Sequence, residues 1–276
     1  MHKFDKHDIR VFDAFINKFA QKYVEQRSKN NIDFDVIDTT FLFEASGFSS
    51  AELKRRILES SVAKDLKREK GEPPSVLNDI YRSDLGELLM TYYFEEKTDK
   101  EEQFFIPLKN ISDRELASQP GRGLDAIGFR TNGNIIDILL GEAKVSAEKK
   151  SPPKVVDTTE DSIYETHKKH RDNKEKLIDR LTDHCRKLDT KDAAILGLGI
   201  LFLDNGNTDR LRITYGCTLI RDSECVNEIS DFGKVKSNCK EFDPNQIRFA
   251  ILSFTEKNIT ETVNLFYEKV QEIISR

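Results

Sequence analysis

Apolar positions along the chain follow two kinds of spacing, and each kind predicts a different element. Helical spacing gives one apolar face to residues 8–27, 75–96 and 259–273. Short apolar or β-branched runs predict strands at residues 103–108, 135–140, 193–203, 211–220 and 247–254. The run at 193–203 is the longest, and its apolar continuity predicts a buried, central strand. Together these elements predict an α/β fold with a mixed central sheet flanked by helices.

A mostly helical N-terminal lobe is predicted ahead of this sheet, over residues 1–72. Residues 33–43 are rich in Ile, Val, Phe and Thr, which predicts an extended segment within the lobe. Ser49 and Glu52 have the spacing of a capping box, which should open a helix that runs to about Lys70. Glu72-Pro73-Pro74 then interrupts regular structure. We therefore place a domain boundary there, with the second domain at residues 73–276.

A β-hairpin is predicted between Gly121 and Lys144. Asn132-Gly133 is the strongest short hairpin signal, because both residues tolerate the positive φ that a type I′ turn requires. If Thr131 pairs with Asn134, Asp125 faces Leu140 and lies diagonally beside Glu142, with α-carbons about 7–8 Å apart. Because side chains alternate along a strand, Glu142 and Lys144 point to the same face.

Two carboxylates and a lysine would therefore meet at this end of the hairpin. Oxygen ligands of this kind suit Mg²⁺ or Mn²⁺, which lower the pKa of a bound water and stabilise charge on a phosphoryl oxygen. Lys144 could orient or deprotonate the attacking water, or offset the developing negative charge. The alternative is an exposed strand end with an ordinary Glu-Lys pair. The apolar run 135–140 that leads into Glu142 favours the metal site, since a buried strand has no need of this triplet.

The same residues carry a resemblance to known nucleases. Asp125 followed by Glu142-Ala143-Lys144 resembles the core motif of the PD-(D/E)xK nucleases, with Leu124 in place of the proline. More narrowly, three stretches together resemble the HamA family, the nuclease-like component of the Hachiman anti-phage defence system: RSDLGELLMTYYFEE at 82–96, GRGLDAIGF at 121–129 and LLGEAKVS at 139–146.

The resemblance, which covers residues 79–146, implies a restriction-endonuclease-like fold over residues 73–276 and metal-dependent cleavage of DNA. It implies catalytic roles for Asp125, Glu142 and Lys144, with Glu87 on the first core helix as a third acidic ligand of Mg²⁺ or Mn²⁺. It also implies a helicase partner of the HamB kind. A nuclease-like fold that binds DNA or a partner with weak or no cleavage is the competing hypothesis.

Basic residues near this motif allow two interpretations. Arg122 stands at the mouth of the predicted site, where it either contacts a substrate phosphate or is an ordinary turn arginine. Residues 158–188 predict one long polar helix or two shorter ones, locally basic but diluted by acids. His167 and His170 lie on this helix, and we expect them to be exposed unless they contact substrate.

Composition narrows the class of protein. The net charge of −5 gives no global attraction to nucleic acid, so such binding requires a local basic patch or a partner. The N-terminal residues lack an apolar signal-peptide core, and no apolar run approaches the ~18–20 residues of a membrane span. Four cysteines without a C-x-x-C pair indicate free thiols in a reducing cytoplasm. No P-loop or G-x-S-x-G motif is present, which argues against an ATPase or serine hydrolase.

Overall fold

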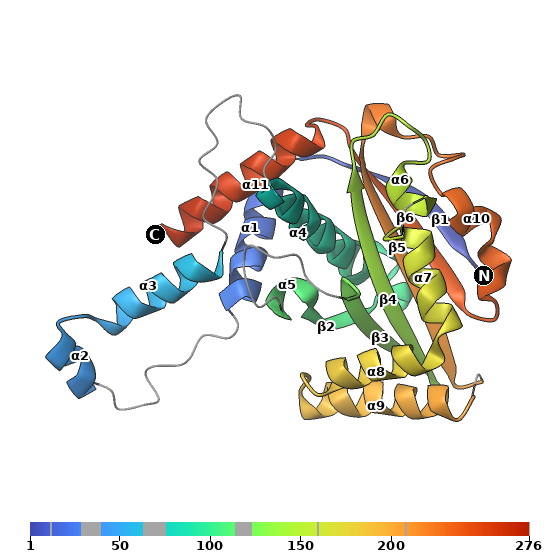
Figure 1. Ribbon diagram of the computed structural model, residues 1–276, viewed down its shortest axis with the longest axis horizontal. Coiled ribbons are helices and arrows are strands. Elements are labelled where there is room, and N and C mark those ends of the chain that lie inside the picture. The colour runs from blue at the N-terminus through green and yellow to red at the C-terminus, as the bar shows by residue number, and fades with distance from the viewer. Residues whose placement is uncertain are drawn as a thin grey trace.

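Six strands form one mixed sheet at the centre of the protein (Figure 1). The computed structural model describes residues 1–11, 13–28, 40–62, 76–113, 123–158, 160–207 and 209–275. Strand order is β1-β6-β5-β4-β3-β2, parallel from β1 to β4 and antiparallel from β4 to β2. The strands are β1 (Lys3–Ile9), β2 (Phe105–Lys109), β3 (Ala126–Asn132), β4 (Ile135–Ser146), β5 (Leu211–Asp222) and β6 (Gln246–Phe254). The α/β fold with a mixed sheet is thus confirmed.

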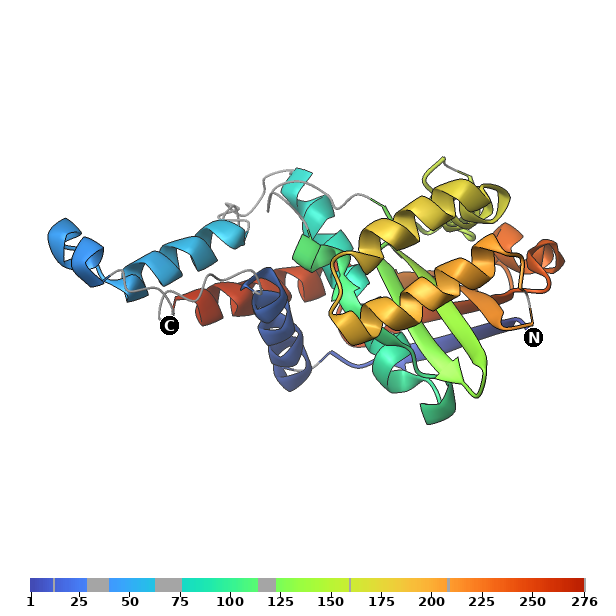
Figure 2. The same ribbon diagram turned by 90° about the horizontal axis from the view of Figure 1, so that it is seen from below.

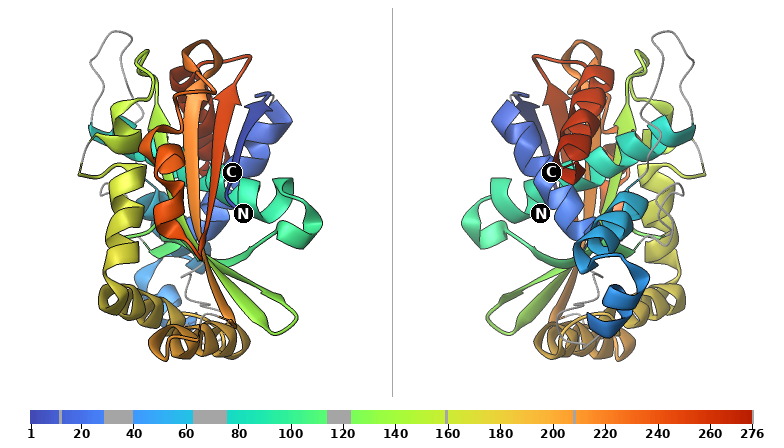
Figure 3. Two further views of the ribbon diagram at one scale, coloured as in Figure 1. Left: turned by 90° about the vertical axis from the view of Figure 1, so that its right-hand side faces the viewer. Right: turned by 90° about the vertical axis from the view of Figure 1, so that its left-hand side faces the viewer.

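Helices cover both faces of the sheet, and each face has its own apolar core. One core lies under α1 (Asp13–Ser28), α4 (Val76–Tyr92) and α11 (Ile259–Ile274), on the left of the sheet in Figure 1. The other lies under α6 (Lys154–Asp157), α7 (Ile163–Asp172), α8 (Lys174–Cys185), α9 (Thr190–Asp204) and α10 (Gly233–Ser237). Figure 2 shows α8 and α9 side by side, and Figure 3 shows α7 on the opposite side of the sheet from α4 and α11.

The remaining helical segments are short. They are α2 (Thr40–Ser46), α3 (Ser50–Ser61), a π-helical turn (Tyr93–Lys97), α5 (Asn110–Asp113) and three 3₁₀ turns (Lys100–Glu102, Ser223–Cys225 and Cys239–Phe242). The helical pattern predicted for 158–188 forms two helices, α7 and α8. Among the described residues, no helix combines the length and apolarity that crossing a bilayer requires.

The N-terminal residues belong to the sheet, which corrects the predicted separate lobe at 1–72. Strand β1 pairs with β6 from Lys3 opposite Arg248 to Ile9 opposite Phe254. Helix α1 packs on α11, with the Tyr23 ring 5.6 Å from that of Phe266. The sequence KFDKHDI contains no apolar run, so its hydrophobic pattern does not predict a strand. Its charged residues are compatible with the position of β1 at the edge of the sheet. The proposed boundary at 72/73 lies outside the described residues.

Helices α2 and α3 follow in this N-terminal part. The capping box is confirmed, since Ser49 Oγ accepts from the Glu52 N–H at 3.2 Å and Glu52 Oε2 accepts from the Ser49 N–H at 2.8 Å. However, α3 ends at Ser61, short of the predicted Lys70, and Val62 is extended. Residues 40–43, predicted as extended, are helical, and 33–39 lie outside the described residues.

The apolar run 193–203 forms the greater part of helix α9, so the predicted central strand is wrong there. Asp189 caps this helix, its Oδ1 accepting from the Asp192 N–H at 2.9 Å. An apolar run of this length fits a buried strand or a helix equally well by periodicity. The cap at Asp189 was the signal that distinguished the two. The sequence of this helix shows no polar face, because Leu198 and Leu201 are apolar although they are exposed.

The hairpin β3–β4 exists, with a register one pair away from the predicted one. Asn132 pairs with Ile135, so Gly133 and Asn134 are the two turn residues. Gly133 has a φ of +58° and no other residue described in this turn has a positive φ. Positive and then negative φ, with glycine first, is the pattern of a type II′ turn instead of type I′. Continuing this register places Asp125 opposite Glu142 instead of Leu140.

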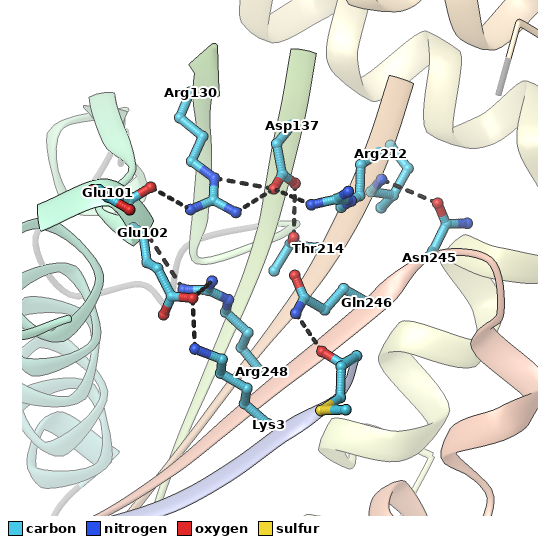
Figure 4. A network of polar contacts seen from close by, with 12 residues as sticks. Lys3, Glu101, Glu102, Arg130, Asp137, Arg212, Thr214, Asn245, Gln246 and Arg248 are labelled. Carbon is cyan, nitrogen blue, oxygen red and sulfur yellow. Dashed lines mark hydrogen bonds and ion pairs between the residues drawn. The ribbon is translucent and has the colours of Figure 1, made fainter. Parts of the chain in front are cut away.

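A buried ion pair fixes that register (Figure 4). Arg130 and Asp137 oppose one another on β3 and β4, and Asp137 Oδ2 accepts from Arg130 Nε at 3.0 Å and Nη2 at 2.7 Å. Asp137 Oδ1 accepts from the Thr214 hydroxyl of β5 at 2.7 Å. A slip by one residue would separate these partners and turn every apolar side chain to the wrong face.

We predict that Arg130→Met lowers the free energy of unfolding by about 3–5 kcal/mol, because it removes the nearest charge partner of the buried Asp137 carboxylate. Arg212→Met is the matched control. Its side chain is 44% exposed and 3.9 Å from the same carboxylate, so about 1 kcal/mol or less is expected. Urea unfolding of the two variants measures both values. Equal losses would show that the Arg130–Asp137 pair has no special part in stability.

Candidate functional site

Asp125 and Glu142 come together at the end of the hairpin. Asp125 immediately precedes β3, its N–H donates to the Gly141 carbonyl at 3.1 Å, and its Oδ2 accepts from the Ala143 N–H at 2.7 Å. Side chains of directly opposed residues share a face of the sheet. Glu142 follows Ile138 and Leu140 along β4, and both of these pack in the core under α7, α8 and α9. The two carboxylates therefore meet at the edge of that core.

Glu142 is the buried member of the pair. Its side chain is 4% exposed, and no hydrogen-bond partner for its Oε2 is present among the described residues. Burial raises the pKa of the Glu142 carboxyl well above its usual range, and the charge of Asp125 raises it further, against the opposing effect of Lys144. The site therefore holds a carboxylate that lacks both solvent and sufficient positive charge, a condition that a bound cation relieves.

Lys144 is held between two acids. Its Nζ lies 3.0 Å from Glu142 Oε1 and donates to Asp161 Oδ2 at 2.8 Å. Burial by itself would lower the pKa of the Lys144 ammonium, but the charges of Glu142 and Asp161 outweigh it, and the pKa is raised. Lys144 thus carries its proton at neutral pH, and acts here as a cation.

Asp161 is a member of the site that sequence analysis missed. It lies in the turn before α7, next to Ser162, which caps that helix by accepting from the Glu165 N–H at 3.3 Å. Its side chain is 87% exposed and contacts Lys144. No sequence signal pointed to it, since the contact joins a strand to a turn across a loop.

The predicted third acidic ligand, Glu87, is not brought into this pair. Helix α4 packs on the opposite face of the sheet, where Gly86 approaches Ala143 and Val145. The Glu87 side chain is buried and its Oε1 accepts from Asn110 Nδ2 at 3.4 Å. Within the described ranges, no three His, Cys, Asp or Glu side chains are grouped closely enough to hold a metal ion. Arg122 lies outside the described residues.

Two cavities flank the carboxylates. A cavity of about 290 Å³ adjoins Asp125, and another of about 270 Å³ adjoins Glu142 and Asp161. Gly123, Lys176 and Arg180 line both. Lys176 and Arg180 are four residues apart on α8 and so share one face of that helix. This spacing was the available signal, but the surrounding acids in the sequence obscured it.

Both helix histidines are buried, so the expectation of exposure is wrong. His167 Nε2 lies 3.3 Å from the Gly216 carbonyl, and burial, with the nearby His170, lowers the pKa of His167 to about 3. Burial, with the charge of Arg180, lowers the pKa of His170 to about 4. His170 lines the cavity beside Glu142. Both imidazoles are therefore neutral at neutral pH, because their burial disfavours the charged form.

We predict that these histidines destabilise the fold in acid. In the unfolded chain a histidine has a pKa of about 6.5, so between pH 6.5 and 4 the unfolded state takes up protons that the folded state does not. Stability is lost as pH falls through this window, by about 1.4 kcal/mol per pH unit for each histidine. The difference in unfolding free energy between wild type and His167→Gln should therefore shrink as pH falls from 6.5 to 4.5. A difference independent of pH would contradict this.

Comparison with known proteins identifies the family. A family model described as HamA matches residues 5–270, nearly the whole chain. Among curated proteins and among solved structures, no significant match was found. Asp125, Glu142 and Lys144, the three residues that the fold assembles, lie within the matched range. This chain belongs to the HamA family and is a component of a Hachiman-type anti-phage defence system.

Proposed function

We propose that this protein hydrolyses DNA phosphodiester bonds with a divalent cation held by Asp125 and Glu142. The observation that carries the proposal is the buried, opposed carboxylate pair, in which Glu142 Oε2 has no partner among the described residues. Burial and the charge of Asp125 raise the pKa of the Glu142 carboxyl, and a bound cation would stabilise its charged form. The donor set is all oxygen, which suits Mg²⁺ or Mn²⁺.

In this proposal, Asp125, Glu142 and Lys144 have different roles. The cation, when bound, lowers the pKa of a water molecule and stabilises charge on a phosphoryl oxygen. Asp125 and Glu142 would hold it, and the hydrogen bond from the Ala143 N–H to Asp125 Oδ2 orients the Asp125 carboxylate. The raised pKa of Lys144 favours one of its predicted roles, an ammonium group that orients water or offsets developing negative charge, over a base that removes a proton.

Neither Asp161 nor Glu87 is required to hold the proposed cation. Lys144 contacts both Asp161 and Glu142, which leaves one of its three N–H donors for water or substrate. Asp161 is exposed enough to move with little loss of packing. Glu87, on α4, is joined to Asp125 through Asn110, whose side chain donates to Glu87 Oε1 and whose backbone N–H donates to the Asp125 carbonyl, each at 3.4 Å.

The setting would be a defence complex with a helicase partner of the HamB kind. The sequence has no P-loop, so ATP-driven movement along DNA would come from that partner. The net charge of −5 also favours delivery of DNA by a partner over capture by a general electrostatic field. The partner would restrain cleavage until the complex is activated.

A second candidate is a DNA- or partner-binding module with weak or no cleavage. It is favoured by the absence of a three-acid metal group among the described residues. The two candidates differ in the expected effect of an isosteric substitution that removes one carboxylate charge: it abolishes cleavage in the first and leaves binding unchanged in the second.

We predict that the full-length protein, with its helicase partner present or absent, cuts plasmid or linear DNA in Mg²⁺ or Mn²⁺ and not in EDTA. Glu142→Gln removes a cation ligand and Lys144→Met removes the positive charge, so each should lower the cleavage rate by about 100-fold or more. Cutting that depends on the helicase would add support for the proposed regulation.

Matched controls are available at exposed positions that line neither cavity. Glu268→Gln on α11 and Lys257→Met in the preceding loop make the same chemical changes at exposed positions and should retain wild-type rates. Glu87→Gln should retain most of the activity if the site is as small as proposed. Wild-type protein that never cuts under any condition would remove the nuclease proposal and leave the binding module.

A further inference from the structure

Lys176 and Arg180 occupy the boundary between the two cavities. Both residues line the cavity beside Asp125 and the cavity beside Glu142, and Gly123 is the third residue common to both. A chain-like ligand that occupies both cavities therefore meets these two cations.

Most neighbouring basic side chains already have partners. Lys144 binds Glu142 and Asp161, Lys169 donates to the Glu160 carbonyl at 2.9 Å, and Lys174 donates to the Asp204 carbonyl at 2.8 Å. By contrast, neither the Lys176 ammonium nor the Arg180 guanidinium makes an ion pair or hydrogen bond with another described residue.

The acids near the two cations do not neutralise them. Asp183 lines the first cavity, but its carboxylate already forms an ion pair with Lys187, with Nζ and Oδ2 3.2 Å apart. Asp179 lines the same cavity, and no bond joins it to Arg180. The positive charge is felt within the site, because Arg180 and Lys176 both contribute to the lowered pKa of His170, after the larger effect of burial.

The position of Arg180 depends on Gly123. A Cβ atom at residue 123 would lie 2.8 Å from Arg180 Nη1, and the φ of Gly123 is +108°, which side chains other than glycine rarely adopt. The guanidinium therefore packs directly against backbone that is two residues from Asp125. Glycine at this point allows the cation to come this close to the site.

We propose that Arg180 and Lys176 bind backbone phosphates of a DNA strand that passes from the cavity of Asp125 to that of Glu142. This inference rests on the proposed function for its choice of ligand. A guanidinium presents paired N–H donors that match two phosphate oxygens, and a lysine adds a point charge four residues away. A protein of net charge −5 needs such a local pair to hold a polyanion beside two carboxylates.

The test measures binding separately from cleavage. Full-length protein is titrated, in EDTA, into a fluorescein-labelled oligonucleotide, as a single strand and as the duplex of the same sequence, and anisotropy is recorded at several salt concentrations. The variant is Lys176→Gln/Arg180→Gln. The matched control is Lys149→Gln/Lys191→Gln, which removes the same charge at exposed positions that line neither cavity.

The Lys176→Gln/Arg180→Gln variant should bind at least about tenfold more weakly. Its plot of log affinity against log salt should be shallower by about 1.4 for the single strand or about 1.8 for the duplex, since two phosphate contacts are lost. The control should retain both values. The charge-conserving Lys176→Arg/Arg180→Lys variant should retain the salt slope, which separates a loss of charge from a folding defect.

Unchanged affinity and slope in the glutamine variant would overturn the inference, as would equal losses in the control or no binding by wild type. Failure of the proposed function looks different. If DNA binds through Lys176 and Arg180 but wild type never cuts, this inference stands and the nuclease proposal fails. If wild type cuts while the glutamine variant binds normally, the reverse holds.

Discussion

The cross-strand pair of Arg130 and Asp137 is the constraint on which the candidate site depends. The pair lies at one end of the β3–β4 hairpin, and Thr214 ties it to β5. A β-hairpin can change register only by whole residues, and each step reverses the faces of one strand. A polar pair that is buried on one side of the sheet therefore determines which residues oppose one another at the far end. There, the same register brings Asp125 beside Glu142.

The two faces of the sheet have different tasks. The face under α1, α4 and α11 is filled with aromatic and aliphatic side chains, and the buried Asp84 carboxylate there accepts from the Tyr267 hydroxyl at 2.8 Å. The face under α7, α8 and α9 has a comparable core but opens at one end into two cavities with charged walls. The first face stabilises the sheet, and the second places the Asp125 and Glu142 carboxylates beside the two cavities.

The chemistry of that end comes from an unfavourable arrangement of charge. Glu142 is buried next to Asp125, and a single shared lysine does not compensate for the lost solvation. Placing charges in this way costs stability, which the well-packed opposite face can tolerate. The same arrangement favours binding of a cation between these groups. Lys176 and Arg180 on α8 favour binding of an anion nearby. Neutral His167 and His170 add no charge of their own, so they do not interfere with either.

Local pattern was sufficient for much of this structure. Strands β2, β4, β5 and β6, helices α4 and α11, and the capping box of α3 were predicted from spacing and capping residues, which act within a few positions of the chain. The hairpin and its three chemical residues, Asp125, Glu142 and Lys144, were also predicted, because an apolar strand that ends in acids is unusual in itself. The apolar run of α9 is compatible with either a strand or a helix, and the prediction of a strand there is wrong.

By itself, the sequence determined the fold class, the identity of the carboxylate pair and the family. The tertiary structure decided the rest: the exact opposition of Asp125 and Glu142, the incorporation of β1 into the sheet, the place of Glu87 on the other face, and the entry of Asp161, Lys176 and Arg180 into the site. These features join residues that are far apart along the chain or depend on a one-residue difference in register. Patterns over a few residues carry no information on such contacts, since packing between separate elements creates them.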